Sequence, residues 1–242
     1  GTFSGDLTVD TNTLVVDSVN NRVGVGTANP TEEIHGYSSG GDFSLKLESA
    51  SATGTAYTYY KNADRQWATG IRGSVGDSYQ IIDSTADTAR LVIDTAGRVT
   101  MPYQPAFQVK KIASQINITV GADVTVLWET EVFDAGSDFA SNTFTAPVTG
   151  KYQLNVHLLV EQVDTASDYY QLKLTTSNRL YYDTVDPGMS SAAIYSYLTL
   201  NNSVLADMDE GDTAIVMIRQ ATGTSQSDLN GTTCVFSGYL VA

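Results

Sequence analysis

A strict alternation of apolar and polar residues runs through the middle of the chain. From Tyr152 to Val160 every even-numbered residue is aromatic or aliphatic, while Gln153, Asn155 and His157 stand between them. A period of two is typical of a β-strand that packs one face and turns the other to water or to a partner. Similar alternation recurs over residues 170–174, 194–200 and 235–241. We therefore predict an all-β protein.

The first hundred residues contain two copies of one short pattern. Residues 14–25 and residues 91–101 each hold an apolar strand, a polar turn with Asn or Gly, and a return strand that opens with Arg. This pattern predicts two β-hairpins. Shorter alternating runs at residues 43–47 and 57–59 predict further strands. Hairpins of this size cannot bury their own apolar faces, so identical copies of the chain are the simplest cover.

Two prolines mark the expected domain boundary. Pro102 and Pro105 follow the second hairpin directly and predict a stiff junction. Residues 1–102 then form a β-rich shaft that is completed by trimerisation. Residues 103–242 hold regularly spaced short strands, which favours a sandwich or jelly roll.

Charge and composition narrow the function further. The 242 residues carry 27 acidic and 13 basic side chains, a formal net charge of −14. Binding to nucleic acid or to an anionic membrane surface needs basic residues, so both are disfavoured. No apolar run reaches the roughly 18 residues of a membrane helix, so no membrane insertion is expected. The single cysteine, Cys234, excludes an internal disulfide and should be a buried, reduced thiol.

The C-terminal region carries the motifs of a known family. Residues 144–152 read Phe-Thr-Ala-Pro-Val-Thr-Gly-Lys-Tyr, Gly211-Asp212 precedes an apolar strand, and residues 236–240 read Phe-Ser-Gly-Tyr-Leu. Their order and spacing over residues 105–242 resemble the globular head of complement component 1q, within the tumour-necrosis-factor group. The resemblance implies a ten-strand-type jelly roll that forms homotrimers, with Tyr239 at the interface between the three copies.

The N-terminal region resembles a different kind of protein. The hairpin that runs into Val23-Gly24-Val25-Gly26-Thr27, with its echo before Met101, is similar to the shaft of bacteriophage tail fibres. No collagen repeat precedes the head, so the animal complement architecture is not implied. Together the two resemblances imply a trimeric tail fibre tip that belongs to the virion and acts outside the cell.

The titratable residues form no convincing catalytic set. The two histidines, His35 and His157, are predicted on the surface, which leaves a serine or cysteine nucleophile with few bases. Glu129 and Glu131 are spaced as a glycosidase pair could be, although a solvated strand face explains them more simply. We expect no enzymatic activity.

Two acidic groups could hold Ca²⁺, but neither predicts a firm site. The first contains Asp207, Asp209, Glu210 and Asp212, and its Gly-Asp pair is what a tight turn favours. The second contains Asp164, Asp168, Asp183 and Asp186, and the family resemblance supports it slightly. We expect no cofactor, with Ca²⁺ as the open alternative.

Tyrosine is enriched where binding is expected. Residues 169–197 contain six tyrosines beside Asp, Asn and Ser, a combination that suits sugar rings and protein surfaces, although some must fill the core or the trimer interface. Antiparallel alternation places residues 164–168, 184–191 and 220–230 together at the end of the head away from the shaft. The predicted receptor-binding residues are Asp164, Asp168, Tyr181, Tyr182, Asp183, Asp186, Ser225, Gln226, Asp228 and Asn230.

Three functions remain open from the sequence. The first is a receptor-binding tip whose three heads attach to a host-cell glycan or surface protein and gain avidity together. The second is a polysaccharide depolymerase of the tailspike type, which would need a paired-carboxylate cleft. The third is a passive cap that only trimerises the fibre.

Overall fold

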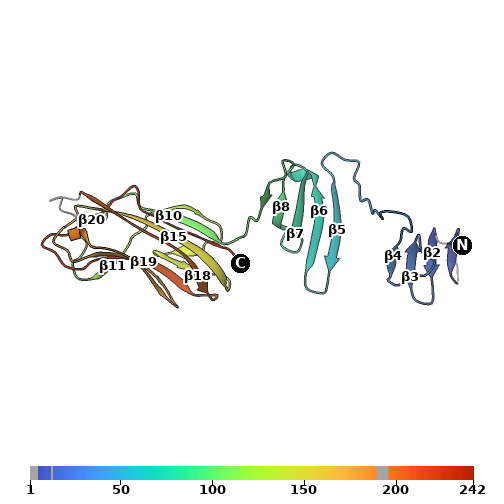
Figure 1. Ribbon diagram of the computed structural model, residues 1–242. Helices are drawn as coiled ribbons and strands as arrows, with labels where there is room; N and C mark the ends of the chain where they lie inside the picture. Colours follow the sequence, from blue (N-terminus) through green and yellow to red (C-terminus); the bar gives the residue numbers. More distant parts are fainter. Residues whose placement is uncertain (1–4, 12, 190–195) are drawn as a thin grey trace. The chain divides into compact units, whose positions relative to one another are not determined.

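The computed structural model describes residues 5–11, 13–189 and 196–242. Its strands form four sheets, and the helical segments in the described residues are two short 3-10 turns, Gly73–Val75 and Pro187–Met189 (Figure 1). The predicted all-β class is confirmed. The chain forms two compact units, the second of which contains all of residues 80–242. The boundary placed at residue 102 from the two prolines stays a prediction.

The first sheet contains the first predicted hairpin. Its four strands, in sheet order, are β1 (Leu7–Val9), β2 (Leu14–Asp17), β3 (Arg22–Val25) and β4 (Ile34–Gly36). Strands β2 and β3 pair antiparallel, with Leu14 opposite Val25 and Asp17 opposite Arg22. The Asp17 carboxylate accepts hydrogen bonds from the backbone N–H groups of Val19 and Asn20, which fixes the turn.

The second sheet contains the other hairpin. Its strands, in sheet order, are β5 (Thr55–Lys61), β6 (Gln66–Arg72), β7 (Ser78–Asp83), β8 (Thr88–Ile93) and β9 (Val99–Thr100). Ile93 pairs with Val99 as predicted, and residues 57–59 lie in β5. The strand predicted at residues 43–47 is wrong, because that segment pairs with no strand and its apolar side chains are exposed.

The two remaining sheets form the C-terminal sandwich. One, the β15 sheet, has the order β12 (Thr130–Asp134), β10 (Ala106–Lys110), β21 (Val235–Leu240), β15 (Gly150–Glu161) and β18 (Tyr197–Met208). The other, the β16 sheet, has the order β13 (Phe139–Ala140), β14 (Thr143–Thr145), β19 (Thr213–Gln220), β16 (Tyr170–Thr176) and β17 (Leu180–Val185). The short strands β20 (Asp228–Leu229) and β11 (Asp123–Thr125) pair with β15 and β19. This two-sheet antiparallel order is a jelly roll of ten main strands, as predicted.

The predicted alternation in β15 decides what the sandwich buries. All five even-numbered residues from Tyr152 to Val160 are buried, and the Tyr152 hydroxyl donates a hydrogen bond to the Val148 carbonyl oxygen at 2.7 Å. Between the sheets the Phe107 ring stacks on Phe144, with 4.6 Å between ring centroids. Stacked and edge-to-face rings add to the free energy of burial, so the sandwich has a firm core on which loops can be held.

Cys234 lies in this core and tests how tightly it is packed. The side chain is fully buried, and burial raises the pKa of its thiol. A thiol reagent should therefore label the native protein at least about a hundredfold more slowly than the denatured protein, measured as the rate of modification. The matched control is Cys234→Ala with Thr233→Cys, which moves the thiol to an exposed neighbour. Equal labelling rates for the parent and this control would contradict the burial.

Candidate functional site

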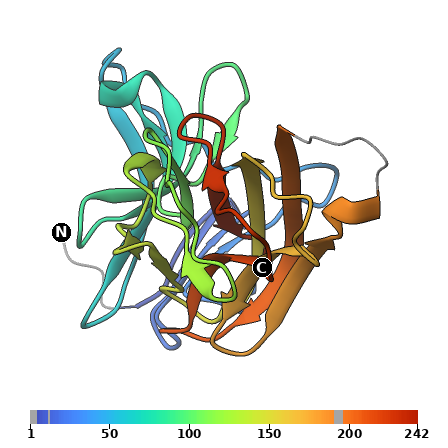
Figure 2. The same ribbon diagram turned by 90° about the vertical axis from the view of Figure 1, so that its left-hand side faces the viewer.

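Three loops lie together at one end of the sandwich. At the other end the chain enters β10, and the Gln104 side-chain amide donates a hydrogen bond to the Leu240 carbonyl oxygen at 3.1 Å. Away from it, the backbone N–H of Asp168 donates to the Thr222 hydroxyl at 2.9 Å, and Gly188 lies beside the Thr165 carbonyl oxygen. We call this region, formed by residues 164–168, 184–189 and 220–230, the loop end. Figure 2 looks onto the side of Figure 1 on which β20 lies. Residues 190 and 191 of the predicted middle loop are outside the described residues.

Asp164 fixes two of these loops to each other. Its carboxylate accepts hydrogen bonds from the backbone N–H groups of Ala166, Thr224 and Ser225, at 2.9, 2.5 and 2.9 Å. Burial of this carboxyl opposes ionisation, but the N–H donors outweigh that effect and hold its pKa below the ordinary value. With 8% of its surface exposed, Asp164 has a structural role, and the prediction that it contacts a receptor is not supported by its position.

Asp228 and Asn230 are also occupied inside the protein. The Asp228 carboxylate accepts hydrogen bonds from the Asn117 backbone N–H at 2.8 Å and from the Gln162 side-chain amide at 2.6 Å, and the residue is buried. The Asn230 side-chain oxygen accepts from the backbone N–H groups of Thr232 and Thr233. Both side chains hold the loop end together rather than reaching outward.

The three predicted residues at 181–183 lie within strand β17 rather than in a loop. Tyr181 pairs with Leu174 and Asp183 with Leu172, and both leucines are fully buried, so these two side chains face inward. The Asp183 carboxylate accepts a hydrogen bond from the backbone N–H of Asn201 in β18 at 2.9 Å. Tyr182 points to the outer face and is 51% exposed.

Four predicted residues remain exposed at the loop end. They are Asp168, Asp186, Ser225 and Gln226. Asp186 accepts a hydrogen bond from the Gly188 backbone N–H at 2.8 Å, and the Gln226 amide donates to the Asn117 carbonyl oxygen at 3.2 Å, so both side chains have fixed positions. Carboxylate, hydroxyl and amide groups held in place can exchange hydrogen bonds with sugar hydroxyls or with a protein backbone.

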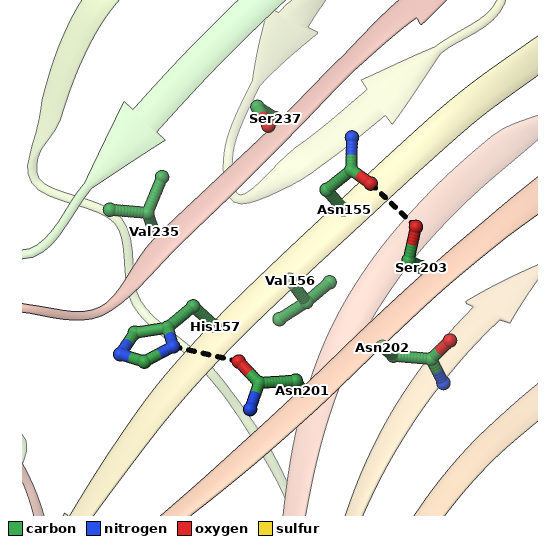
Figure 3. Close-up of a pocket in the computed structure, with 8 residues that line it drawn as sticks. All are labelled: Asn155, Val156, His157, Asn201, Asn202, Ser203, Val235 and Ser237. Carbon is green, nitrogen blue, oxygen red and sulfur yellow. Dashed lines mark hydrogen bonds between the residues drawn. The ribbon is translucent and has the colours of Figure 1, made fainter.

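The outer face of the β15 sheet is partly apolar. Tyr239, Leu205 and Phe133 are 50%, 57% and 49% exposed there. A polar ladder crosses the same face, in which His157 bonds to Asn201 at 2.7 Å and the Ser203 hydroxyl donates to Asn155 at 2.8 Å (Figure 3). The ladder lines a shallow hollow of about 400 Å³. Large exposed rings and aliphatic groups on a flat sheet are typical of an interface between protein copies.

The candidate catalytic carboxylates do share one hollow. Glu129 and Glu131 both line a space of about 380 Å³ beside Trp128. The Glu129 carboxylate is engaged, because it accepts hydrogen bonds from the buried Lys111 ammonium and from the Ile112 backbone N–H, both at 3.0 Å. One member of the predicted pair is therefore held in a structural ion pair.

The other candidates from the sequence are placed as follows. In the acidic group at residues 207–212, the Asp209 N–H donates to the Asp212 carboxylate at 2.8 Å and closes a tight turn at Gly211. Within the described residues, no three His, Cys, Asp or Glu side chains gather as a metal ion would require. In the same part of the chain, no helix is long and apolar enough to cross a membrane.

Sequence reasoning did not single out one cluster on the β16 sheet. Lys173 in β16 and Arg219 in β19 both contact the carboxylate of Asp123 in β11. These three strands are adjacent in the sheet. The signal was present, since the two basic residues occupy outward positions beside buried apolar neighbours in a strongly acidic chain.

Among the comparisons with known proteins, only the comparison with solved structures gives matches. No protein-family model matches the chain, and no curated protein matches it. The globular domain of the zebrafish complement 1qA protein is similar at 16% identity and a TM-score of 0.40, over 57% of this chain and 98% of that chain. Murine APRIL at pH 8.0 is similar at 15% identity and a TM-score of 0.42, over 57% of this chain and 99% of that chain.

Proposed function

We propose that this chain is the tip of a trimeric bacteriophage tail fibre and attaches the virion to a glycan or protein of the host-cell surface. The observation that carries the proposal is the loop end, where hydrogen bonds donated to the Asp164 carboxylate fix two loops at the opposite end from the point of chain entry. Exposed polar side chains on a rigid scaffold are the usual form of a binding surface. The resemblance of residues 14–27 to a fibre shaft supports the context.

Trimerisation is part of the same proposal. The family resemblance over residues 105–242 implies three copies, and Tyr239 with Leu205 and Phe133 supplies an exposed apolar face that a neighbouring copy would cover. Three loop ends then point at one surface. Weak single contacts gain avidity when several heads engage together, so each contact need not be tight.

Changing the exposed side chains of the loop end should abolish most attachment. The double variant Asp186→Ala with Gln226→Ala removes one carboxylate and one amide without touching the bonds of Asp164. A loss of about 1 to 3 kcal/mol per site, repeated in three copies, should lower retention on susceptible bacteria at least about tenfold, measured by co-sedimentation of labelled protein with a panel of bacterial strains.

The control for this experiment is Glu210→Ala, an exposed carboxylate in the tight turn before β19. It should leave attachment unchanged. Undiminished attachment of the double variant would place the receptor site elsewhere on the protein. Failure of the parent to bind any strain in the panel would instead favour the passive cap.

The proposed mechanism is binding without cleavage. The Glu129 carboxylate is already bonded to Lys111 and Ile112. Glycosidase chemistry needs two available carboxylates, and in the hollow that the two glutamates share Glu131 therefore has no free partner. New reducing ends released from bacterial polysaccharide by the protein would contradict this point and favour a depolymerase.

A further inference from the structure

The outer face of the β16 sheet carries a compact cluster of charges. The Lys173 ammonium lies 2.7 Å from each oxygen of the Asp123 carboxylate, and the Arg219 guanidinium donates to the same carboxylate at 3.1 Å. Leu172 and Leu174 on either side of Lys173 are fully buried, so Lys173 lies on the outer face, where 14% of its side chain and 28% of that of Arg219 are exposed. We call these three residues, with the flanking Tyr169 and Tyr182, the Asp123 cluster.

The Asp123 cluster has more positive than negative charge. Two cations share one carboxylate, and in the part of the chain that the structure describes neither cation pairs with a second carboxylate. Hydrogen bonding from Lys173 lowers the pKa of Asp123, and the hydrogen bond that Arg219 donates to Asp123 raises the pKa of Arg219, so Asp123 and Arg219 are both charged at neutral pH. One unit of positive charge is thus concentrated at this point of a chain whose net charge is −14.

Two other lysines of the sandwich are arranged differently. Lys111 is buried and contacts the single carboxylate of Glu129, and Lys151 contacts that of Asp207. In each of these pairs one cation meets one anion. At Asp123, by contrast, two cations contact one carboxylate, and an anionic group could neutralise the remaining positive charge.

Two tyrosines lie at the sides of the cluster. Tyr169 lies near Arg219 and helps to raise the pKa of its guanidinium. The Tyr182 ring lies beside Lys173, with 5.8 Å between the ammonium nitrogen and the ring centroid, and half of the residue is exposed. Two residues along the same pair of strands, the Gln171 amide donates to the Thr184 hydroxyl at 2.9 Å. One acidic sugar offers a partner to each of these groups. Its C–H face can stack on the flat ring, its acid group can pair with the cation, and its hydroxyls can bond to the amide or hydroxyl groups.

We propose that the Asp123 cluster binds a carboxylate-bearing sugar, such as a hexuronate residue of an acidic surface polysaccharide. The sugar carboxylate contacts the outward N–H groups of Lys173 and Arg219, and the pyranose ring stacks on Tyr182. This inference rests on the proposed attachment function and names a ligand class for it. It places the contact on a strand face beside the loop end rather than on the loops themselves.

Binding to three polymers tests the inference directly. The probes are polygalacturonate, the same polymer after reduction of its carboxyl groups, and poly-glutamate of similar length. The intact protein should bind polygalacturonate at least about tenfold more tightly than either of the others, measured as dissociation constants by biolayer interferometry. The affinity should also fall as salt is raised, because charges at the surface are screened.

Variants separate the charge from the ring. Lys173→Gln and Tyr182→Ala should each weaken binding to polygalacturonate at least about fivefold, while Tyr182→Phe keeps the ring and most of the affinity. Lys151→Gln removes an exposed cation elsewhere and is the matched control. Melting curves of each variant should show that the sandwich remains folded, because Tyr182 is exposed.

Each of these results either supports or overturns the acidic-sugar site. Equal affinity for the carboxyl-reduced polymer or for poly-glutamate, no binding to polygalacturonate, or full affinity of Lys173→Gln would overturn the acidic-sugar site. Attachment to bacteria that is lost in the Asp186→Ala and Gln226→Ala variant but kept in Lys173→Gln would overturn this inference and leave the proposed function standing.

Discussion

Asp in place of Tyr239 is expected to convert the proposed trimer into single chains. Tyr239 lies on the outer face of the β15 sheet, separated from Leu205 by Gln153, and half of its surface is exposed in one copy. If three copies bury this face, the substitution removes three rings and places three carboxylates in an apolar contact. Each buried, unpaired charge costs several kcal/mol, so the trimer should be lost at micromolar concentration in sedimentation.

Tyr182 supplies a closely matched control. It is also a strand tyrosine, 51% exposed against 50% for Tyr239, but it lies on the outer face of the opposite sheet. Tyr182→Asp should therefore sediment as the parent does. A Tyr239→Asp protein that stays trimeric with an unchanged melting temperature would remove Tyr239 from the interface, and a parent protein that sediments as one chain would refute trimerisation itself.

Replacement of Asp164 by Ala is expected to release the loop end. The substitution leaves three backbone N–H groups without their acceptor, and charge-assisted hydrogen bonds of this kind contribute about 1.5 to 3 kcal/mol each before relaxation. Stability should fall by roughly 2 to 4 kcal/mol, measured by denaturant unfolding, and attachment to bacteria should fall with it. Hydrogen exchange at Thr224 and Ser225 should accelerate while β15 stays protected.

The effect should depend on pH in a defined direction. Because the folded protein holds the pKa of Asp164 below its unfolded value, its stabilising contribution is complete above the unfolded pKa of about 3.9 and declines as the pH falls through the folded pKa. The stability difference between the parent and Asp164→Ala should therefore shrink in acid. A difference that stays constant from pH 7 to pH 3 would contradict the role assigned to the carboxylate.

The alternation of side chains predicted much of the sandwich. Strand β15 follows the period of two over its whole buried face, and the pairing of β2 with β3 follows from an apolar run, a polar turn and an arginine. These features depend only on residues that are close together in the chain, so they can be predicted from the sequence. The run at residues 43–47 has the same local pattern but no neighbouring strand to bond with, which no local signal reveals.

The positions of the candidate binding residues were harder to predict, for a physical reason. Asp164 and Asp228 look like exposed loop residues, yet both carboxylates accept hydrogen bonds from the backbone of distant segments. Such bonds depend on tertiary contacts. The inward turn of Tyr181 and Asp183, by contrast, follows from parity once β17 is paired with β16, and the same parity places Lys173 and Tyr182 together on the outside.

The bonds of Asp164 have a consequence for how the sequence of the loop end can vary. The carboxylate holds backbone N–H groups at residues 224 and 225, and every residue except proline provides that group. Side chains at these positions can therefore be exchanged while the two backbone bonds to Asp164 remain. Under the proposed attachment function, single substitutions there would alter the choice of host, while the architecture that displays them is inherited intact.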